Sequence, residues 1–273
     1  MNNNKVNGVI ALMVMEKKEY EKGVVRAISR AVRILESFTS DGGMTVTEIS
    51  KILNLPKSSV HNILSTLAKN GILEKDHDNT KYYLGLKLFE LGDKARSSLE
   101  IKKVATPFLK SLNSELGETV HLTVLDKGEV LYLECFESKK RLRTYSVIGV
   151  RAPLYCTGVG KAIMAFLSID EIEEIIQKKG LKKFTERTIV DREKLLKELD
   201  SVRKRGYAID NMEHEDYVRC IGAPIFNHEG KVFASISVSG PSQRVNSESI
   251  PEMVKLVVKA AQGISKKMRY EEK

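Results

Sequence analysis

The sequence predicts an α+β protein in which a small helical domain precedes a larger domain built on an antiparallel sheet. Up to about residue 85 the apolar residues recur mainly at the helical spacing i, i+3, i+4. From residue 101 onward, apolar runs of strand length alternate with helical segments. The chain of 273 residues is also long enough for two domains with separate cores. We therefore expect a first domain over residues 24–85, a linker helix over 86–100 and a second domain over 101–273.

The segment before the first domain, residues 1–23, is interpreted as a flexible N-terminal extension. Its apolar run, Val9–Met15, has only seven residues, which is too short to cross a bilayer, and no signal-peptide cleavage site follows it. Three cysteines, at positions 135, 156 and 220, form no CxxC pair. Neither a disulfide framework nor a zinc finger is therefore indicated. These features favour a cytoplasmic protein without a membrane association.

Three helices and a hairpin are expected in the first domain. The first helix runs from Arg26 to about Phe38. Residues 45–48, Thr-Val-Thr-Glu, form a capping box that starts the second helix. That helix ends at Asn54-Leu55-Pro56, because a residue before proline is driven out of the α region.

The third helix is expected from Pro56 to about Lys69, where Asn70-Gly71 supplies a left-handed stop. Two strand-like runs, 72–75 and 81–84, flank a polar turn and predict a hairpin. Helix, tight turn, helix and hairpin are the layout of a winged helix-turn-helix. DNA is therefore the first partner to consider.

The outer face of the third helix is polar and carries short side chains, which can reach base edges and phosphates. A solvated helix face can carry the same residues. Charge adds little, since residues 24–75 hold seven Lys and Arg against four Asp and Glu. The predicted operator contacts are Ser58, Ser59, Asn62, Ser65 and Lys69 on the helix, with Lys81 and Tyr82 of the hairpin near the DNA backbone.

The second domain is predicted to combine an antiparallel sheet with helices packed on it. Asp126-Lys127-Gly128 and the turn at 227–230 are strong hairpin signals, and Gly206 ends a helix. Strands are expected at 120–125, 130–136, 142–148, 207–210, 220–226 and 232–239, and helices at 158–167, 168–178, 191–205 and 249–269.

Polar residues cluster where these strand ends meet loops. Ser237 and Ser239 share one face of a strand, because side chains alternate with period two. Together with the backbone amides of a helix start near Gly158, their hydroxyls could hold a carboxylate. His121, Asp210 and Cys220 are the other candidates for this site, whereas His214 and His228 are expected in solvated loops.

Five motifs resemble the IclR family of bacterial transcriptional regulators in their order and spacing. They are GETVHL at 117–122, GVGKA at 158–162, RGYAIDN at 205–211, APIF at 223–226 and ISVSGP at 236–241. The resemblance runs from about Val25 to Arg269. It implies an N-terminal winged helix-turn-helix, a linker helix and a C-terminal effector domain of GAF-like (profilin-like) fold. It also implies homodimers, often paired into homotetramers, on double-stranded operator DNA.

The resemblance also implies a small-molecule pocket. Its effectors would be small carboxylates or aromatic acids, such as glyoxylate, pyruvate, sugar acids or benzoate-type compounds. Cys156 departs from the usual pattern, which leaves the ligand open, and repression is the commoner mode in the family. Matching the motifs places the effector site at His121, Gly158, Val159, Asp210, Cys220, Ser237 and Ser239.

Two other classes of function remain to be weighed. An enzyme could use Cys156 or Cys220 as nucleophile with His121 as base, but no GxSxG, HExxH or Gly-rich nucleotide motif is present. Zinc could bind His121, Asp210 and Cys220, although their spacing matches no known ligand pattern. A constitutive architectural DNA binder would not need a second domain with a polar pocket. The sequence therefore favours an effector-responsive transcriptional regulator that acts as a repressor, with no catalytic residues and no cofactor.

Overall fold

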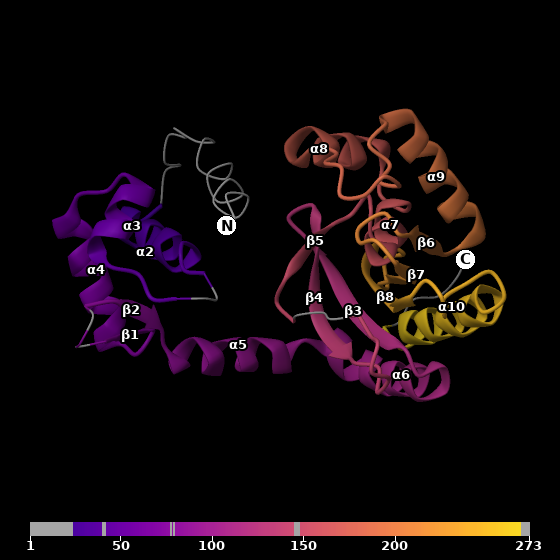
Figure 1. The fold of residues 1–273 in the computed structure, drawn as a ribbon, viewed down its shortest axis with the longest axis horizontal. Helices are drawn as coiled ribbons and strands as arrows, with labels where there is room; N and C mark the ends of the chain where they lie inside the picture. The colour runs from indigo at the N-terminus through magenta and orange to yellow at the C-terminus, as the bar shows by residue number, and fades with distance from the viewer. Residues whose placement is uncertain (1–23, 40–41, 77, 79, 145–147, 269–273) are drawn as a thin grey trace. The chain divides into compact units, whose positions relative to one another are not determined.

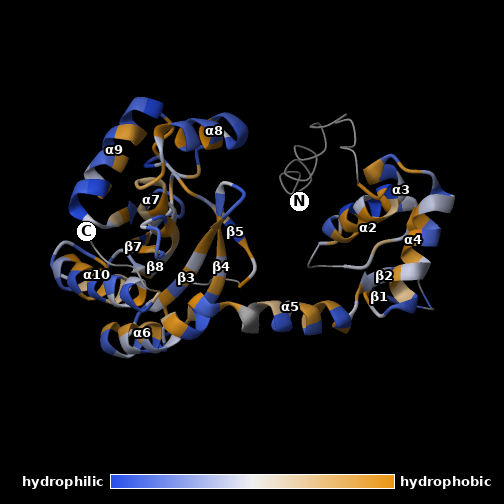
Figure 2. Cartoon of the chain, turned by 180° about the vertical axis from the view of Figure 1, so that it is seen from behind, coloured by the Kyte–Doolittle hydropathy of each residue, from blue (hydrophilic) through white to orange (hydrophobic). Residues whose placement is uncertain are grey.

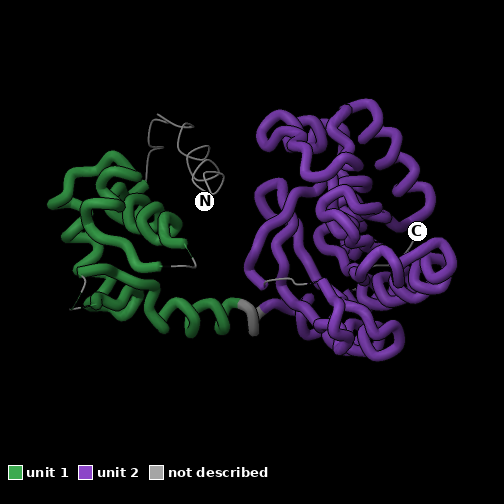
Figure 3. The backbone as a smooth tube through the Cα atoms, in the orientation of Figure 1, with its two compact units in different colours: residues 1–95 green, residues 96–273 purple. Residues whose placement is uncertain are grey.

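The computed structural model of the chain describes residues 24–39, 42–76, 78, 80–144 and 148–268 (Figure 1). The predicted extension, residues 1–23, lies outside the described residues. The chain divides into two compact units, 1–95 and 96–273 (Figure 3), and each unit has a hydrophobic core of its own. None of the described helices has the length and apolar content that a membrane-spanning helix requires.

The first unit is a winged helix-turn-helix, as predicted. Its core is closed by Ile34, Ile49, Val60, Leu64 and Tyr82, which come from all three helices and from the hairpin and are almost completely buried. The hairpin strands pair antiparallel, and Met44 adds an isolated bridge to Tyr82. The elements are α2 (Arg26–Glu36), α3 (Val46–Leu53), α4 (Lys57–Lys69), β1 (Leu73–Lys75) and β2 (Tyr82–Leu84).

Local sequence signals set the helix boundaries of this unit. The Thr45 backbone N–H donates to Glu48 Oε2 at 2.8 Å, and the Glu48 N–H donates to Thr45 Oγ1 at 3.3 Å, so the predicted capping box is formed. Asn54 then ends α3 in a left-handed conformation, with φ of 50°. Pro56 precedes the first residue of α4 and gives that helix its entry angle.

The end of α4 is a Schellman motif. The Gly71 N–H donates to the Ala68 carbonyl and the Ile72 N–H donates to the Leu67 carbonyl, both at 3.0 Å. Gly71 has φ of +71°, a conformation that glycine adopts without a steric penalty. The helix therefore ends sharply, and the chain continues directly into β1.

Two consecutive helices join the first unit to the sheet of the second. Helix α5 (Leu86–Ser98) lies within the predicted linker, and α6 (Glu100–Leu116) follows it. The α6 helix was not predicted. It contains Pro107, which cannot donate a backbone hydrogen bond, yet its buried face of Ile101, Ala105, Leu109 and Leu112 packs into the core of the second unit. Burial of this face outweighs the local cost of the proline.

The second unit is built on a six-stranded antiparallel sheet in the order β5-β4-β3-β8-β7-β6. The antiparallel sheet confirms the predicted α+β class. The strands are β3 (Thr119–Asp126), β4 (Glu129–Phe136), β5 (Arg151–Pro153), β6 (Ala208–Asn211), β7 (Val218–Phe226) and β8 (Val232–Pro241).

The strand predicted at 142–148 is wrong. Its residues 142–144 and 148 are irregular or in turns, and 145–147 lie outside the described residues. The edge of β4 pairs instead with β5, through Val130 opposite Ala152. Leu142 is exposed, and its carbonyl accepts a hydrogen bond from the Arg244 side chain. This apolar residue therefore lies in a loop and does not pack into the core.

Helices cover both faces of the sheet. Helices α6 and α10 (Ile250–Lys267) pack on one face, and α7 (Gly158–Met164) packs on the other. Helices α8 (Ile169–Lys179) and α9 (Arg192–Arg205) enclose α7 in a second core, which contains Ile172 and Leu199. The face that carries α7 is the one on which the candidate site is formed.

Candidate functional site

The sheet register brings the predicted site residues together. His121 on β3 lies directly opposite Ser237 on β8. Across the next two strand pairs, Cys220 on β7 lies opposite both Ser239 on β8 and Asp210 on β6. Directly paired residues of an antiparallel sheet point to the same face. Three consecutive strands, β6, β7 and β8, and the distant strand β3 therefore supply one polar surface.

This surface forms the wall of a cavity of about 200 Å³. All seven residues predicted for the effector site line it. The complete lining is His121, Tyr132, Thr144, Val150, Arg151, Ala152, Thr157, Gly158, Val159, Asp210, His214, Glu215, Val218, Cys220, Ser237 and Ser239.

The N-terminus of α7 closes one side of the cavity. The Thr157 hydroxyl accepts from the Gly160 N–H at 3.0 Å, and the amides of Gly158 and Val159 are first-turn amides, which have no acceptor within a helix. The approach of α7 to the sheet requires glycine, because a Cβ added at Gly222 would lie 2.3 Å from the Gly158 carbonyl oxygen. Backbone donors are thereby held against the strand that carries Cys220.

His121 is a buried, neutral imidazole. Its Nδ1 lies 3.3 Å from Ser237 Oγ and 3.4 Å from Ser239 Oγ, and its ring meets Tyr132 edge-to-face at 5.3 Å between centroids. Burial lowers the pKa of His121 to about 4. At neutral pH the ring therefore contributes one donor and one acceptor but no positive charge.

The pKa values of Asp210 and Cys220 are also shifted in the direction that favours the uncharged form of each side chain. Burial raises the pKa of Asp210 to about 7, and the charge of Glu213 acts in the same direction, although the Glu213 backbone N–H donates to Asp210 Oδ1 at 2.7 Å. Burial and the neighbouring Asp210 raise the pKa of the Cys220 thiol well above its usual range. Burial likewise raises the pKa of Cys156. Neither cysteine is a thiolate nucleophile at neutral pH.

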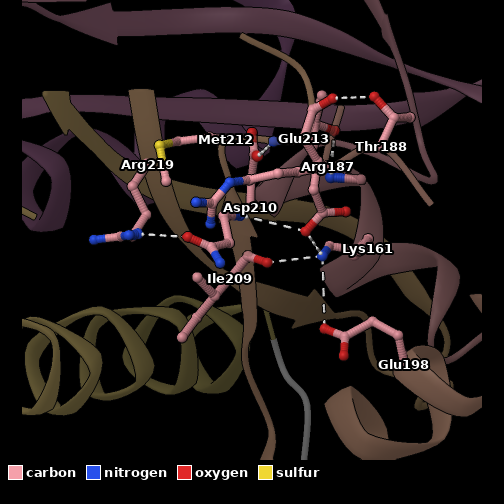
Figure 4. A network of polar contacts seen from close by, with 12 residues as sticks. Lys161, Arg187, Thr188, Glu198, Ile209, Asp210, Met212, Glu213 and Arg219 are labelled. Carbon is pink, nitrogen blue, oxygen red and sulfur yellow. Dashed lines mark hydrogen bonds and ion pairs between the residues drawn. The ribbon is translucent and has the colours of Figure 1, made fainter. Parts of the chain in front are cut away.

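A buried ion pair beneath the cavity was not found by sequence reasoning. Lys161 on α7 is 1 % exposed, and its Nζ donates to the Ile209 carbonyl at 2.7 Å and to Glu213 Oε1 at 2.5 Å (Figure 4). Glu198 on α9 lies 3.5 Å from the same Nζ. The one sequence feature that could have indicated this ion pair is a lysine inside the apolar helical segment after Gly158. The pair ties α7 to the loop that follows Asp210.

The loop after β6 contributes two further lining residues, His214 and Glu215. His214 was expected in solvent, but its side chain is only 28 % exposed, lines the cavity and packs against Phe184 at 5.1 Å between ring centroids. Met212 and Tyr217 bracket this loop with φ values of 62° and 63°. Such left-handed turns at non-glycine residues are not readable from a single sequence.

The zinc candidates His121, Asp210 and Cys220 share the cavity wall. Within the part of the chain that the structure describes, no three His, Cys, Asp or Glu side chains converge in an arrangement that could hold a metal ion. The hydrogen-bonding partners given above are hydroxyls and backbone amides.

The predicted DNA-contacting residues lie on the first unit and, with one exception, at its surface. On α4, Ser58, Asn62 and Lys69 are exposed, and Ser59 and Ser65 are partly exposed, as is Lys81 on the hairpin. The assignment of Tyr82 is wrong, because its side chain is 2 % exposed and fills the core beneath α4. Its neighbour Tyr83 points to the other face of the strand and is partly exposed.

Two family models match the chain. The model of the bacterial transcriptional regulator IclR C-terminal domain matches residues 93–266, and the model of the IclR helix-turn-helix domain matches residues 27–77. Together they extend over both units.

Individual relatives agree with these models. The HTH-type transcriptional regulator KdgR of Escherichia coli (strain K12) is 37% identical over 246 residues, which cover 90% of this chain and 94% of that protein. The transcriptional repressor IclR of the same strain is 31% identical over 246 residues, covering 89% and 90%. The crystal structure of an IclR homolog complexed with 4-hydroxybenzoate, from Microbacterium hydrocarbonoxydans, has a TM-score of 0.77 at 29% identity and covers 89% of this chain and 99% of that one.

Proposed function

This chain belongs to the IclR family of transcriptional regulators, and from that premise we propose that a small carboxylate or aromatic acid binds its second unit and changes its affinity for operator DNA. The relatives are named as transcriptional regulators and not as enzymes. The observation that carries the proposal is the convergence of the seven predicted residues on one cavity. The cavity has the donors of a binding site and lacks an ionised cysteine.

An acid fits the donors of this cavity. The hydroxyls of Ser237 and Ser239 and the first-turn amides of Gly158 and Val159 can all donate to a carboxylate. The protonated form of Asp210 adds a further donor. One of the related structures carries 4-hydroxybenzoate, and a volume of about 200 Å³ suits ligands of that size.

Operator DNA would be read by α4 and the hairpin of the first unit. The exposed Ser58, Asn62 and Lys69 present two short polar side chains and one cation on the surface of the helix that follows the tight turn. Repression is the proposed sign of regulation, and a relative of 31% identity is named a repressor. Binding to bacterial operator DNA requires the protein to reside in the cytoplasm.

A homodimer, or a homotetramer made from two such dimers, is the proposed assembly. Helix α2 exposes Val25, Ile28 and Val32 at helical spacing, and α5 exposes Leu86 and Phe89 (Figure 2). Exposed apolar faces of this kind mark association surfaces. Two copies joined there would present two reading helices to a pair of half-sites.

The ligand part of the proposal is tested by thermal unfolding of the full chain. Small carboxylates, sugar acids and aromatic acids are added one at a time, and zinc and a chelator form separate arms. A ligand that binds only the folded protein raises the melting temperature. The proposal requires a shift with at least one acid that is lost in Ser239→Ala. A shift with zinc alone, reversed by the chelator, would assign the cavity to a metal ion instead.

A further inference from the structure

A second cavity lies on the other side of strand β6 from the candidate site. Its volume is about 620 Å³. Side chains alternate along a strand, and accordingly Asp210 lines the first cavity, whereas Ile209 and Asn211 line the second. The lining is Arg187, Ile189, Glu198, Arg205, Ile209, Asn211, Glu213, Arg219, Ser247 and Ile250.

The acidic side chains of this second cavity are already neutralised. Glu213 is paired with Lys161 at 2.5 Å. Glu198 is paired with Arg205 at 2.9 Å, and the Arg205 guanidinium also lies over the ring of Tyr207 at 5.0 Å. Each of the two carboxylates is therefore paired with a cation, so the acidic side chains add no net negative charge to the cavity.

The two remaining guanidiniums have no acidic partner among the described residues. Arg219 donates to Asn211 Oδ1 at 2.9 Å and to the Val245 carbonyl, both of which are neutral acceptors. No side-chain partner of Arg187 is found within the described part of the chain. Figure 4 shows both guanidiniums on the same side of the Lys161–Glu213 pair. Together they leave an excess of two positive charges at the cavity wall.

The position of Arg187 is fixed by the loop that carries it. The Arg187 N–H donates to Thr185 Oγ1 at 3.0 Å. The Thr185 and Thr188 hydroxyls in turn donate to the Met212 and Glu213 carbonyls, at 2.7 and 2.6 Å. The loop is thus attached to the segment that contributes the cavity floor. The Arg219 guanidinium is held by its neutral acceptors and the Arg187 backbone by its loop, which leaves both side chains available to an anion that can accept several hydrogen bonds.

One acceptor at this floor is unused. Oε2 of Glu213 is buried and has no hydrogen-bond partner among the described residues, while its Oε1 is bound to Lys161. A buried carboxylate oxygen without a partner is costly. Glu213 contributes to the cavity lining, so a ligand hydroxyl group next to an anionic group would give this oxygen a partner once the side chain turns toward the cavity.

We propose that this second cavity binds a hydroxylated phosphate ester, such as a sugar phosphate, whose phosphate is held by Arg187 and Arg219 and whose hydroxyl donates to Glu213. Arg side chains bind phosphate oxygens through paired N–H groups. The site is separate from the acid-binding cavity. Binding at this site can therefore be confirmed or refuted independently of the function proposed above.

Isothermal titration calorimetry of the full chain with glucose 6-phosphate tests this site, with glucose, inorganic phosphate and a random-sequence DNA duplex as further arms. We expect glucose 6-phosphate to bind more tightly than inorganic phosphate and glucose not to bind. Arg187→Gln and Arg219→Gln should each lower the affinity for glucose 6-phosphate about tenfold or more, because each removes a charge-assisted contact. Arg187 is exposed and lies outside the core, so Arg187→Gln should fold normally.

The matched control is Arg192→Gln, which removes an exposed arginine of α9 that pairs with Glu173 outside the cavity. Its affinity for glucose 6-phosphate should equal that of the parent chain. Ser239→Ala should also retain this binding. The proposal is overturned if the parent chain does not bind glucose 6-phosphate, or if Arg187→Gln binds it unchanged. It is also overturned if the two cavity variants alter only the affinity for the duplex, since the arginines would then serve DNA phosphates.

Discussion

Asp210 is the residue of the candidate cavity whose charge state depends most on conditions near neutrality. It is 3 % exposed, and burial raises its pKa to about 7, whereas His121 on the same cavity wall, with a pKa of about 4, remains neutral. A bound carboxylate and an ionised Asp210 would repel each other in a site of low dielectric constant. The protonated form can instead donate a hydrogen bond to the ligand.

Ligand affinity should therefore fall as the pH rises. If the acid binds only when Asp210 is protonated, the apparent affinity should drop about tenfold between pH 6 and pH 8, because the carboxyl loses its proton around pH 7. Asp210→Asn should remove this dependence. Calorimetric titrations of both proteins across that pH range measure it, and an equal slope in the two proteins would contradict the assigned role.

Asn62 and Lys69 should differ in what they contribute to DNA binding. Asn62 is exposed on α4 and has the amide geometry that reads a base edge, so Asn62→Ala should reduce discrimination between operator and random DNA by about 1–3 kcal/mol. Lys69→Ala, the matched control, should weaken both kinds of DNA alike. Fluorescence anisotropy on the two duplexes separates these effects. Equal losses on both duplexes for Asn62→Ala would remove it from the base-reading residues.

At the scale of elements, Lys161 joins three of them. It lies on α7, bonds to the carbonyl of Ile209 on β6 and to Glu213 in the loop that follows, and approaches Glu198 on α9. The same Glu213 donates its N–H to Asp210. The buried pair therefore positions the cavity wall on both the helix side and the strand side.

Lys161→Met should destabilise the fold by about 3–5 kcal/mol, because it leaves Glu213 as a buried carboxylate without its cation. Adding Glu213→Gln should recover part of this loss, since an amide needs no counter-charge. Chemical unfolding of the parent, the two single variants and the double variant measures the coupling. Strictly additive free energies of unfolding would show that the two side chains do not act as a pair.

Elements specified by short-range signals could be predicted from the sequence, and those specified by burial could not. The capping box at Thr45 is formed as predicted, and a second one is formed by Ser168 and Glu171 in the sequence Ser-Ile-Asp-Glu at 168–171, because each box involves only four residues. Helix α6 was missed because its stability comes from packing against the sheet. The false strand at 142–148 had an apolar composition, but the adjacent edge of β4 is occupied by β5.

The candidate cavity shows the same division. Ser237 and Ser239 share a face by strand period alone. The positions of His121, Asp210, Cys220 and the helix start near Gly158 followed from polar residues where strand ends meet loops, and motif resemblance added Val159. Lys161, His214 and the second cavity depend on contacts between residues 25 to 52 positions apart or on left-handed turns, and neither is visible in a local pattern. Tyr82 was assigned to the wrong face of its strand, because a three-residue strand shows no alternation from which to choose.

At the scale of the whole molecule, the proposed function requires the association of two copies of the chain. Ile28 is 63 % exposed and Phe89 is 75 % exposed, although both are large apolar residues. Ile28→Glu should dissociate the proposed dimer and weaken operator binding by tenfold or more, because one reading helix then binds one half-site. Sedimentation velocity, with Glu36→Gln as the surface control on the same helix, tests this. A variant that keeps the parent's mass would place the interface elsewhere.

An acid bound in the second unit is proposed to change operator binding by the first. The most direct measurement uses an operator selected from random duplexes by the purified protein and follows its binding by anisotropy, with and without the acid that raises the melting temperature. We expect a change of at least tenfold in the apparent Kd for the parent chain and little change for Ser239→Ala, whose affinity without acid stays at the parent value. An apparent Kd that the acid leaves unaltered in the parent chain would contradict it.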